Sequence, residues 1–139
     1  MVSKTASQLK SKQGQPINTL VITEQEEPKY HLGALHDIAA GNNDFILTLV
    51  KIFLDTIPAN SNEMVKACSE GNWDLVSKLA HKLKSTVDMM RIKSITQEIR
   101  TIELDGKRHV NKESLPALVK KVDETIMEVS AQLREEFDL

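Results

Sequence analysis

One histidine stands on the polar side of a predicted helix, where it is placed to do chemistry. At about 100° per residue, His81 falls roughly 200° away from Leu79, around which the apolar residues of this segment gather. The imidazole is therefore expected to face water. An imidazole ordinarily has a pKa of about 6.5, so at neutral pH it presents an unprotonated ring nitrogen as a nucleophile. A solvated histidine without chemistry is the competing interpretation.

The elements that must position this histidine are helices. The apolar spacing predicts a short helix at about 32–39, ended by Gly41, and then a long helix that is capped by Asn43 or Asn42 and runs to Gly71. The next helix is capped by Asn72 and runs from Trp73 to about Met90. Two more helices follow, from Lys93 to about Gly106 and from about Lys112 to Phe137. Pro58 should either kink the long helix or begin a second segment in it, whereas Pro116 is tolerated in a first turn. The sequence predicts an all-α protein, an antiparallel up-and-down four-helix bundle with a short additional N-terminal helix.

Composition agrees with a small helical protein. The chain has 139 residues, enough for one domain with a real core, and its 4% aromatic content and five glycines favour helices over sheets. Residues 1–29 are mostly polar and are predicted to be a flexible arm or linker, with the bundle at 30–139. The net charge of −2 argues against a nucleic-acid binder.

Cysteine usage and hydropathy bear on the compartment. Cys68 is the one cysteine, so it cannot form an internal disulfide, and it is expected to lie in the core. No apolar run reaches the roughly 18 residues that span a bilayer, and the N-terminus lacks the apolar core of a signal peptide. We expect a cytoplasmic protein that does not bind membranes.

Three short stretches together carry a resemblance to a known family. Ala80-His81-Lys82-Leu83-Lys84-Ser85-Thr86, then Met90-Arg91-Ile92, then Ile102-Glu103 resemble the signature of histidine-containing phosphotransfer domains, the phosphorelay carriers of multistep two-component signalling. The resemblance covers roughly residues 31–137. It implies a four-helix bundle with one exposed phosphoaccepting histidine on the second long helix, and it gives His81 that role. Many members of the family have glycine at the positions of Ser85 and Arg91, so the chain departs from the pattern there.

The neighbours of the histidine suit a phosphoryl group and a receiver domain. Lys84, three residues on, is placed to neutralise phosphoryl oxygens, and the small Ser85, four residues on, leaves a partner access. Lys78 and Lys82 add positive charge suited to the acidic pocket of a receiver, although an ordinary solvated face explains the three lysines equally well. Asp88 is a candidate for partner docking. Its side chain either orients the imidazole ring or merely solvates the helix.

Several other kinds of site are not expected. His31, His36 and His109 lie in predicted loops or near helix ends without paired acids, so we interpret them as incidental. The histidines are scattered and no metal-ligand spacing appears, so no metal site is predicted. The sequence has no Walker-type glycine-rich loop, so the chain is expected to bind no cofactor and to have no ATP site of its own. Mg²⁺ is expected on the partner receiver.

The leading hypothesis is a non-enzymatic phosphorelay carrier. It would accept a phosphoryl group on His81 from the aspartate of a response-regulator receiver domain and pass it to another receiver. A hybrid sensor histidine kinase is a further candidate partner, and the polar arm fits either a freestanding monomer or the end of such a kinase. The alternative is a helical adaptor that binds a receiver or another partner without carrying phosphate, a role that would not need His81 and Lys84.

Overall fold

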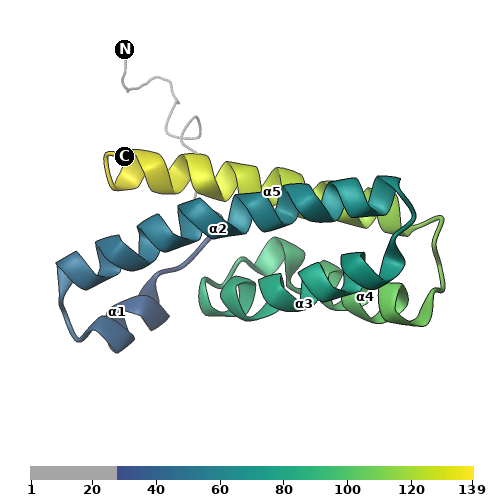
Figure 1. Cartoon of the computed structure of the whole chain (residues 1–139). Coiled ribbons are helices and arrows are strands. Elements are labelled where there is room, and N and C mark those ends of the chain that lie inside the picture. Colours follow the sequence, from purple (N-terminus) through teal and green to yellow (C-terminus); the bar gives the residue numbers. More distant parts are fainter. Residues whose placement is uncertain (1–27) are drawn as a thin grey trace, which may run out of the picture.

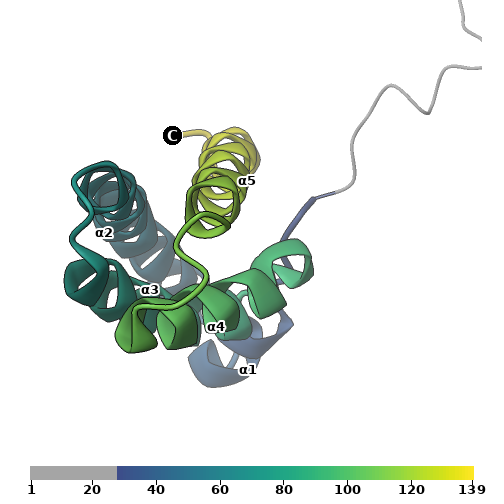
Figure 2. The ribbon, with the colours of Figure 1, turned by 90° about the vertical axis from the view of Figure 1, so that its right-hand side faces the viewer.

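The computed structural model describes residues 28–139, which form five helices and no strand (Figure 1). The helices are α1 (Gly33–Ala39), α2 (Asn43–Ser69), α3 (Trp73–Met89), α4 (Lys93–Arg108) and α5 (Leu115–Glu136). Each long helix contacts the next one along the chain, and α5 also packs against α2 (Figure 2). The predicted all-α four-helix bundle with a short additional helix is confirmed. The predicted arm falls almost entirely outside the described residues.

Each long helix buries one apolar face in the common core. In α3, Val76, Leu79, Leu83 and Val87 expose 1% or less of their surface. Isoleucines fill the corresponding face of α4, namely Ile95, Ile99 and Ile102. Burial of such side chains stabilises the fold by about 1.5–3 kcal/mol each. Cys68 also lies in the core, as predicted, and burial raises the pKa of its thiol.

Asparagine side chains cap the N-termini of α2 and α3. The Asn42 side chain accepts a hydrogen bond from the backbone N–H of Phe45 at 3.1 Å, so Asn42, and not Asn43, caps α2. The Asn72 side chain accepts one from the N–H of Leu75 at 3.3 Å and caps α3 as predicted. Both caps satisfy a donor that the first turn of a helix leaves free.

The structure gives the exact helix ends and the position of Pro58, which the sequence left open. Pro58 lies inside one continuous helix α2, so it does not begin a second segment. Helix α5 starts at Leu115, because residues 112–114 form a turn, and Pro116 lies in its first turn as predicted. The residue that ends α1 in the left-handed conformation is Ala40, with φ 51°, and Gly41 follows it with φ 83°.

Gly106 does not end its helix. Helix α4 continues to Arg108, and Gly106 is buried where α4 crosses close to α3. A Cβ atom at this position would lie 3.1 Å from the carbonyl oxygen of Trp73 and 3.3 Å from Cβ of Ser77. The glycine is therefore a packing requirement between two helices instead of a stop signal.

The segment Pro28–Leu32, here called the N-terminal strap, precedes α1 and is hydrogen-bonded to the bundle. The backbone N–H of His31 donates to the carbonyl of Met90 at 2.7 Å, and that of Lys29 donates to the side chain of Gln132 at 2.9 Å. The buried Tyr30 hydroxyl donates to Glu136, and burial together with this hydrogen bond raises the pKa of Tyr30. The strap thus joins α5 to the turn between α3 and α4.

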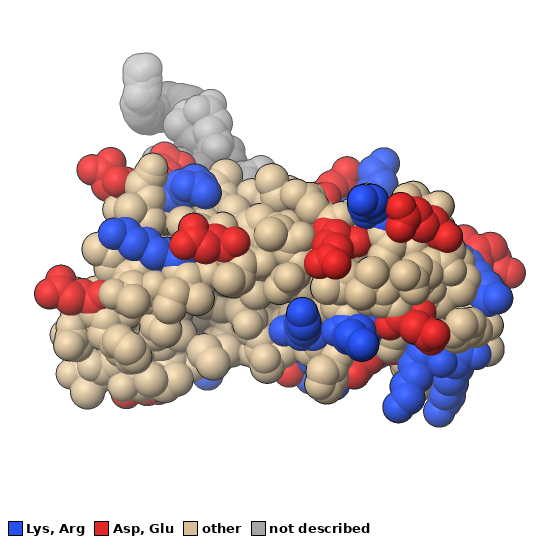
Figure 3. Space-filling model, viewed as in Figure 1, with Lys and Arg blue, Asp and Glu red and all other residues tan. Residues whose placement is uncertain are grey.

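Charges of both signs are mixed over the face shown in Figure 3, in keeping with the small net charge. The part of this face over α1 is mostly uncharged, whereas side chains of both signs lie over the first half of α2. Ile38, Phe45 and Ile52 are exposed by 58%, 41% and 52% in these helices. Within residues 28–139, no helix is both long enough and apolar enough to cross a bilayer.

Candidate functional site

His81 lies in the middle of α3 with its side chain 68% exposed. The exposure predicted from the helical spacing is therefore confirmed. Its neighbours in the chain, Ala80 and Leu83, are fully buried, and they fix the rotation of α3 about its axis. The core packing of the helix thus keeps the imidazole at the surface.

A carboxylate from the next helix holds the ring. Nδ1 of His81 lies 2.6 Å from Oε2 of Glu103 in α4, 22 residues away in the sequence. The second oxygen of the same carboxylate, Oε1, accepts a hydrogen bond from Nζ of Lys84 at 2.8 Å. Glu103 therefore links the histidine to the lysine one helical turn beyond it, and the three side chains form one connected group.

The close approach of α3 and α4 brings this carboxylate into reach. Ser77, one turn before His81, donates from its hydroxyl to the backbone carbonyl of Glu103 at 2.7 Å. Gly106, three residues after Glu103, leaves room for α3 at the same crossing. Residues 77 and 81 of α3 thus face residues 103 and 106 of α4.

The charge on Glu103 determines which ring nitrogen is available. The hydrogen bond from Lys84, and then the one from His81, outweigh partial burial and hold the pKa of the Glu103 carboxyl below its ordinary value. Near neutral pH this group is a carboxylate, which can only accept hydrogen bonds. A neutral His81 ring must then carry its proton on Nδ1 and keep the lone pair on Nε2. Nε2 is then the ring nitrogen that can act as a nucleophile.

The remaining predicted site residues lie around this group. Ser85, Lys78 and Lys82 are all exposed on α3, and neither of these two lysines forms an ion pair with a described residue. Asp88 does not contact the His81 ring. Its carboxylate accepts two hydrogen bonds from the guanidinium of Arg100, at 2.8 and 3.1 Å. The ring-orienting role considered for Asp88 is therefore wrong, because Glu103 occupies that position.

The other histidines differ from the expectation in one respect. Nε2 of His109 lies 2.8 Å from Oδ1 of Asp74, so this histidine does have an acidic partner across the α3–α4 crossing. Nδ1 of His31 accepts a hydrogen bond from the backbone N–H of Gly33 at 3.0 Å. In the described part of the chain, no group of three histidine, cysteine or acidic side chains is arranged to hold a metal ion.

Glu103 is the functional candidate that reasoning from the sequence missed. It belongs to the Ile102-Glu103 pair that carries part of the family resemblance, but its spacing in α4 says nothing about which α3 residue it meets. The one available signal was a charged residue directly after a buried isoleucine on a helix expected to lie beside α3. The pairing is fixed by the crossing of α3 and α4, where Gly106 is buried and Ser77 donates to the Glu103 carbonyl.

Comparison with models of known protein families gave a match over most of the described residues. The family model described as Hpt domain matches residues 48–137, which include α3, α4, α5 and most of α2. Neither the curated proteins nor the solved structures gave a match.

Proposed function

The chain belongs to the Hpt domain family, and from this premise we propose that it is a phosphorelay carrier that uses His81. His81 accepts a phosphoryl group from a phosphorylated aspartate of one receiver domain and passes it to the aspartate of another. The observation that carries the proposal is the 68% exposed side chain of His81, whose Nδ1 is held by Glu103 at 2.6 Å.

The chemistry follows from this hydrogen bond. The lone pair of Nε2 attacks the phosphorus of the aspartyl phosphate in line, the new N–P bond forms, and the bond from phosphorus to the aspartate oxygen breaks. The electron pair of the broken bond returns to the aspartate as a carboxylate. Mg²⁺ held by the receiver offsets the charge on the phosphoryl oxygens. The second transfer is the same step in reverse.

Glu103 has a specific part in this step. Phosphorylation of Nε2 leaves the ring positively charged while Nδ1 still carries its proton, and the nearby carboxylate stabilises that cation. The same hydrogen bond keeps the ring from rotating its protonated nitrogen toward the partner. Glu103 acts through His81, so we regard it as a positioning residue.

Lys84 supports the site in two ways. Its ammonium holds Glu103 at 2.8 Å, and it lies one helical turn from the nucleophile, where it is placed to attract phosphoryl oxygens. Ser85 keeps the approach to the ring open, because its side chain is small. Lys78, Lys82 and the Asp88–Arg100 pair flank the site and are the proposed docking contacts for an acidic receiver surface.

We further propose that the chain binds no cofactor, works as a monomer in the cytoplasm, and depends on its partners for phosphate. The competing function is a helical adaptor that binds a receiver without carrying phosphate. An adaptor function does not explain why an exposed histidine is paired with a carboxylate that a lysine also binds. For this reason the carrier is the better supported of the two.

The test is to incubate the chain with a receiver domain phosphorylated with radioactive phosphate. We expect an acid-labile, base-stable label on the chain that disappears in His81→Gln. His36→Gln, an exposed histidine on α1, is the matched control and should retain the label. Label that persists in His81→Gln would contradict the assignment, and an unlabelled wild type that still binds the receiver would favour the adaptor.

A further inference from the structure

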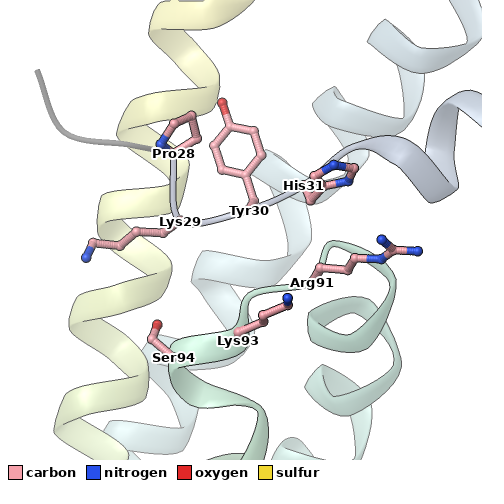
Figure 4. Close-up of a pocket in the computed structure, with 7 residues that line it drawn as sticks. All are labelled: Pro28, Lys29, Tyr30, His31, Arg91, Lys93 and Ser94. Atoms are coloured by element: carbon pink, nitrogen blue, oxygen red, sulfur yellow. The ribbon is translucent and has the colours of Figure 1, made fainter.

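A cavity beside the N-terminal strap is lined almost entirely by polar and basic residues (Figure 4). It measures about 380 Å³ and lies between the strap and the turn that joins α3 to α4. Its lining residues are Pro28, Lys29, Tyr30, His31, Arg91, Lys93 and Ser94. None of them is acidic, although the whole chain carries a net negative charge. The cavity is thus a local concentration of positive charge.

The cations of this cavity have no acidic partner in the described part of the chain. Lys29, Arg91 and Lys93 take part in none of the ion pairs found among residues 28–139. By contrast, Lys84 and Arg100, on the face that carries His81, are each held by a carboxylate. The three cations at the cavity therefore keep their full capacity to bind an anion.

The side chains surround the cavity from two directions. In Figure 4, the Lys93 ammonium and the Ser94 hydroxyl point up toward the strap, while Lys29 and Arg91 flank the space and extend outward. Both outer side chains are long and rotatable, so they can close over a ligand. His31 adds a further donor, because its Nδ1 is engaged by Gly33 and its Nε2 is left available.

Hydrogen bonds fix the backbone that forms one wall of the cavity. The backbone N–H of His31 donates to the carbonyl of Met90 at 2.7 Å, and that of Lys29 donates to Gln132 at 2.9 Å. The Tyr30 hydroxyl bond to Glu136 fixes the middle of the strap. A ligand would have to order only the ends of side chains, which lowers the cost of binding.

We infer that this cavity binds a small phosphate monoester. The three cations attract a phosphate dianion, and its oxygens can accept hydrogen bonds from the guanidinium, the ammonium groups and the Ser94 hydroxyl. The volume exceeds that of a single phosphate group and leaves room for a small organic part. The site lies at the end of α3 and shares none of its lining residues with the His81 site, so it does not rest on the proposed phosphotransfer function.

The test is a titration of the full chain with glycerol phosphate at constant ionic strength. Two-dimensional amide NMR spectra monitor the titration, and sodium chloride is the reference salt. We expect saturable shifts at the amides of Lys93, Ser94 and His31. The variant Lys29→Gln/Arg91→Asn/Lys93→Gln should weaken this binding by about tenfold or more. Asparagine is chosen at position 91 because it tolerates the positive φ of 51° there.

A matched control separates the cavity from overall charge. Lys51→Gln/Lys66→Gln/Lys112→Gln removes the same three charges from exposed positions elsewhere and should leave the binding unchanged. Equal weakening in both triple variants, shifts that never saturate, or shifts centred on His81 would each overturn the inference. Binding that appears only in Glu24→Gln/Glu26→Gln/Glu27→Gln would also overturn it, since the chain's own carboxylates would then be the ligand. His81→Gln should bind as the wild type does, whatever its effect on phosphotransfer.

Discussion

At the scale of single residues, the site depends on one carboxylate that serves two neighbours. Glu103 accepts from His81 with one oxygen and from Lys84 with the other, and it is only 23% exposed. An isolated exposed ion pair contributes little, but here the carboxylate also selects which nitrogen of the ring is nucleophilic. Removing its charge should therefore affect transfer more than stability.

We expect Glu103→Gln to slow phosphoryl acceptance at saturating receiver by about tenfold, the equivalent of about 1.4 kcal/mol in the barrier. Glutamine has nearly the same shape but cannot stabilise the cationic phosphorylated ring. Single-turnover transfer measured against receiver concentration gives the maximal rate. Glu98→Gln, on the same helix but paired with Lys121, is the control and should transfer normally. A normal maximal rate in Glu103→Gln would remove this residue from the mechanism.

Lys84→Ala should change how the protein responds to acid. Because Lys84 is the main cause of the lowered pKa of Glu103, this pKa should rise toward the ordinary value in the variant. In the wild type, ionised Glu103 stabilises the fold above the unfolded pKa of about 4.3, and this contribution is lost as the pH falls through the lower folded pKa. The difference in unfolding free energy between about pH 7 and about pH 3 should therefore be smaller in the variant.

Carbon NMR of the Glu103 carboxyl group and denaturant unfolding at both pH values measure these two effects. Lys82→Ala removes an exposed lysine that has no ion pair with residues 28–139, and it should change neither. An unmoved Glu103 titration in Lys84→Ala would show that the contact between these side chains does not persist in solution.

The exposure of His81 could be predicted from sequence because the apolar spacing of a single helix fixes which side faces the core. The Glu103 partner could not, because the pairing depends on how α3 and α4 are placed along and around each other. Asp88 shows the limit of the same reasoning. It lies on the same side of the helix but seven residues on, about 10.5 Å along the axis, which is too far for its short side chain to reach the ring. Its carboxylate pairs with Arg100 of α4 instead.

At the scale of helices, the positions of the elements follow from periodicity, while their ends and crossings do not. Helix α4 was predicted to end at about Gly106 but continues to Arg108, and glycine is a residue that often follows the last turn of a helix. In the structure it is buried against α3, and nothing in the spacing of α4 alone distinguishes these two uses. The role of the glycine depends on which residues of another helix lie beside it, and the sequence does not show which residues these are.

Gly106→Ala should destabilise the fold by about 1–2 kcal/mol, even though alanine is the better helix former by up to about 1 kcal/mol. The added methyl group would meet the backbone oxygen of Trp73 at 3.1 Å, and backbone atoms yield less easily than side-chain ends. The helices would then separate near His81, so transfer should slow as well. Denaturant unfolding measures the stability, with Gln97→Ala as the control at an exposed position of α4. Equal stability of the glycine variant and wild type would contradict the packing role.

Arg91→Gly should stabilise the protein by about 0.5–1 kcal/mol. Arg91 has a φ of 51° in the turn between α3 and α4, a conformation that costs free energy in residues with a Cβ atom and almost none in glycine. Thermal or denaturant unfolding checks this. Arg134→Gly, in the last turn of α5, should instead lower stability by up to about 1 kcal/mol, because glycine weakens a helix. A loss of stability in Arg91→Gly would show that the arginine side chain contributes more than its backbone costs.

At the scale of the whole molecule, charge distribution governs how partners are found. The chain has a net charge of only −2 and the face shown in Figure 3 carries both signs, so no strong overall field attracts an acidic receiver. The attraction must come from local groups beside the site. Lys78 and Lys82 are the candidates, since they are exposed on α3 next to His81 and have no carboxylate partner within the described residues.

Lys78→Ala/Lys82→Ala should weaken receiver association several-fold at low salt and make it less sensitive to salt, while the maximal transfer rate stays normal. The two ammonium groups act during approach and docking, where the attraction is screened over about 10 Å at 0.1 M salt, and they do not touch the ring. The measurement is the dissociation constant over a series of sodium chloride concentrations, combined with single-turnover rates. Lys51→Ala/Lys66→Ala removes the same charge from α2 and should leave both quantities close to the wild type. If both double variants lose affinity equally, net charge alone governs the encounter, and the receiver is not guided to the face that carries His81.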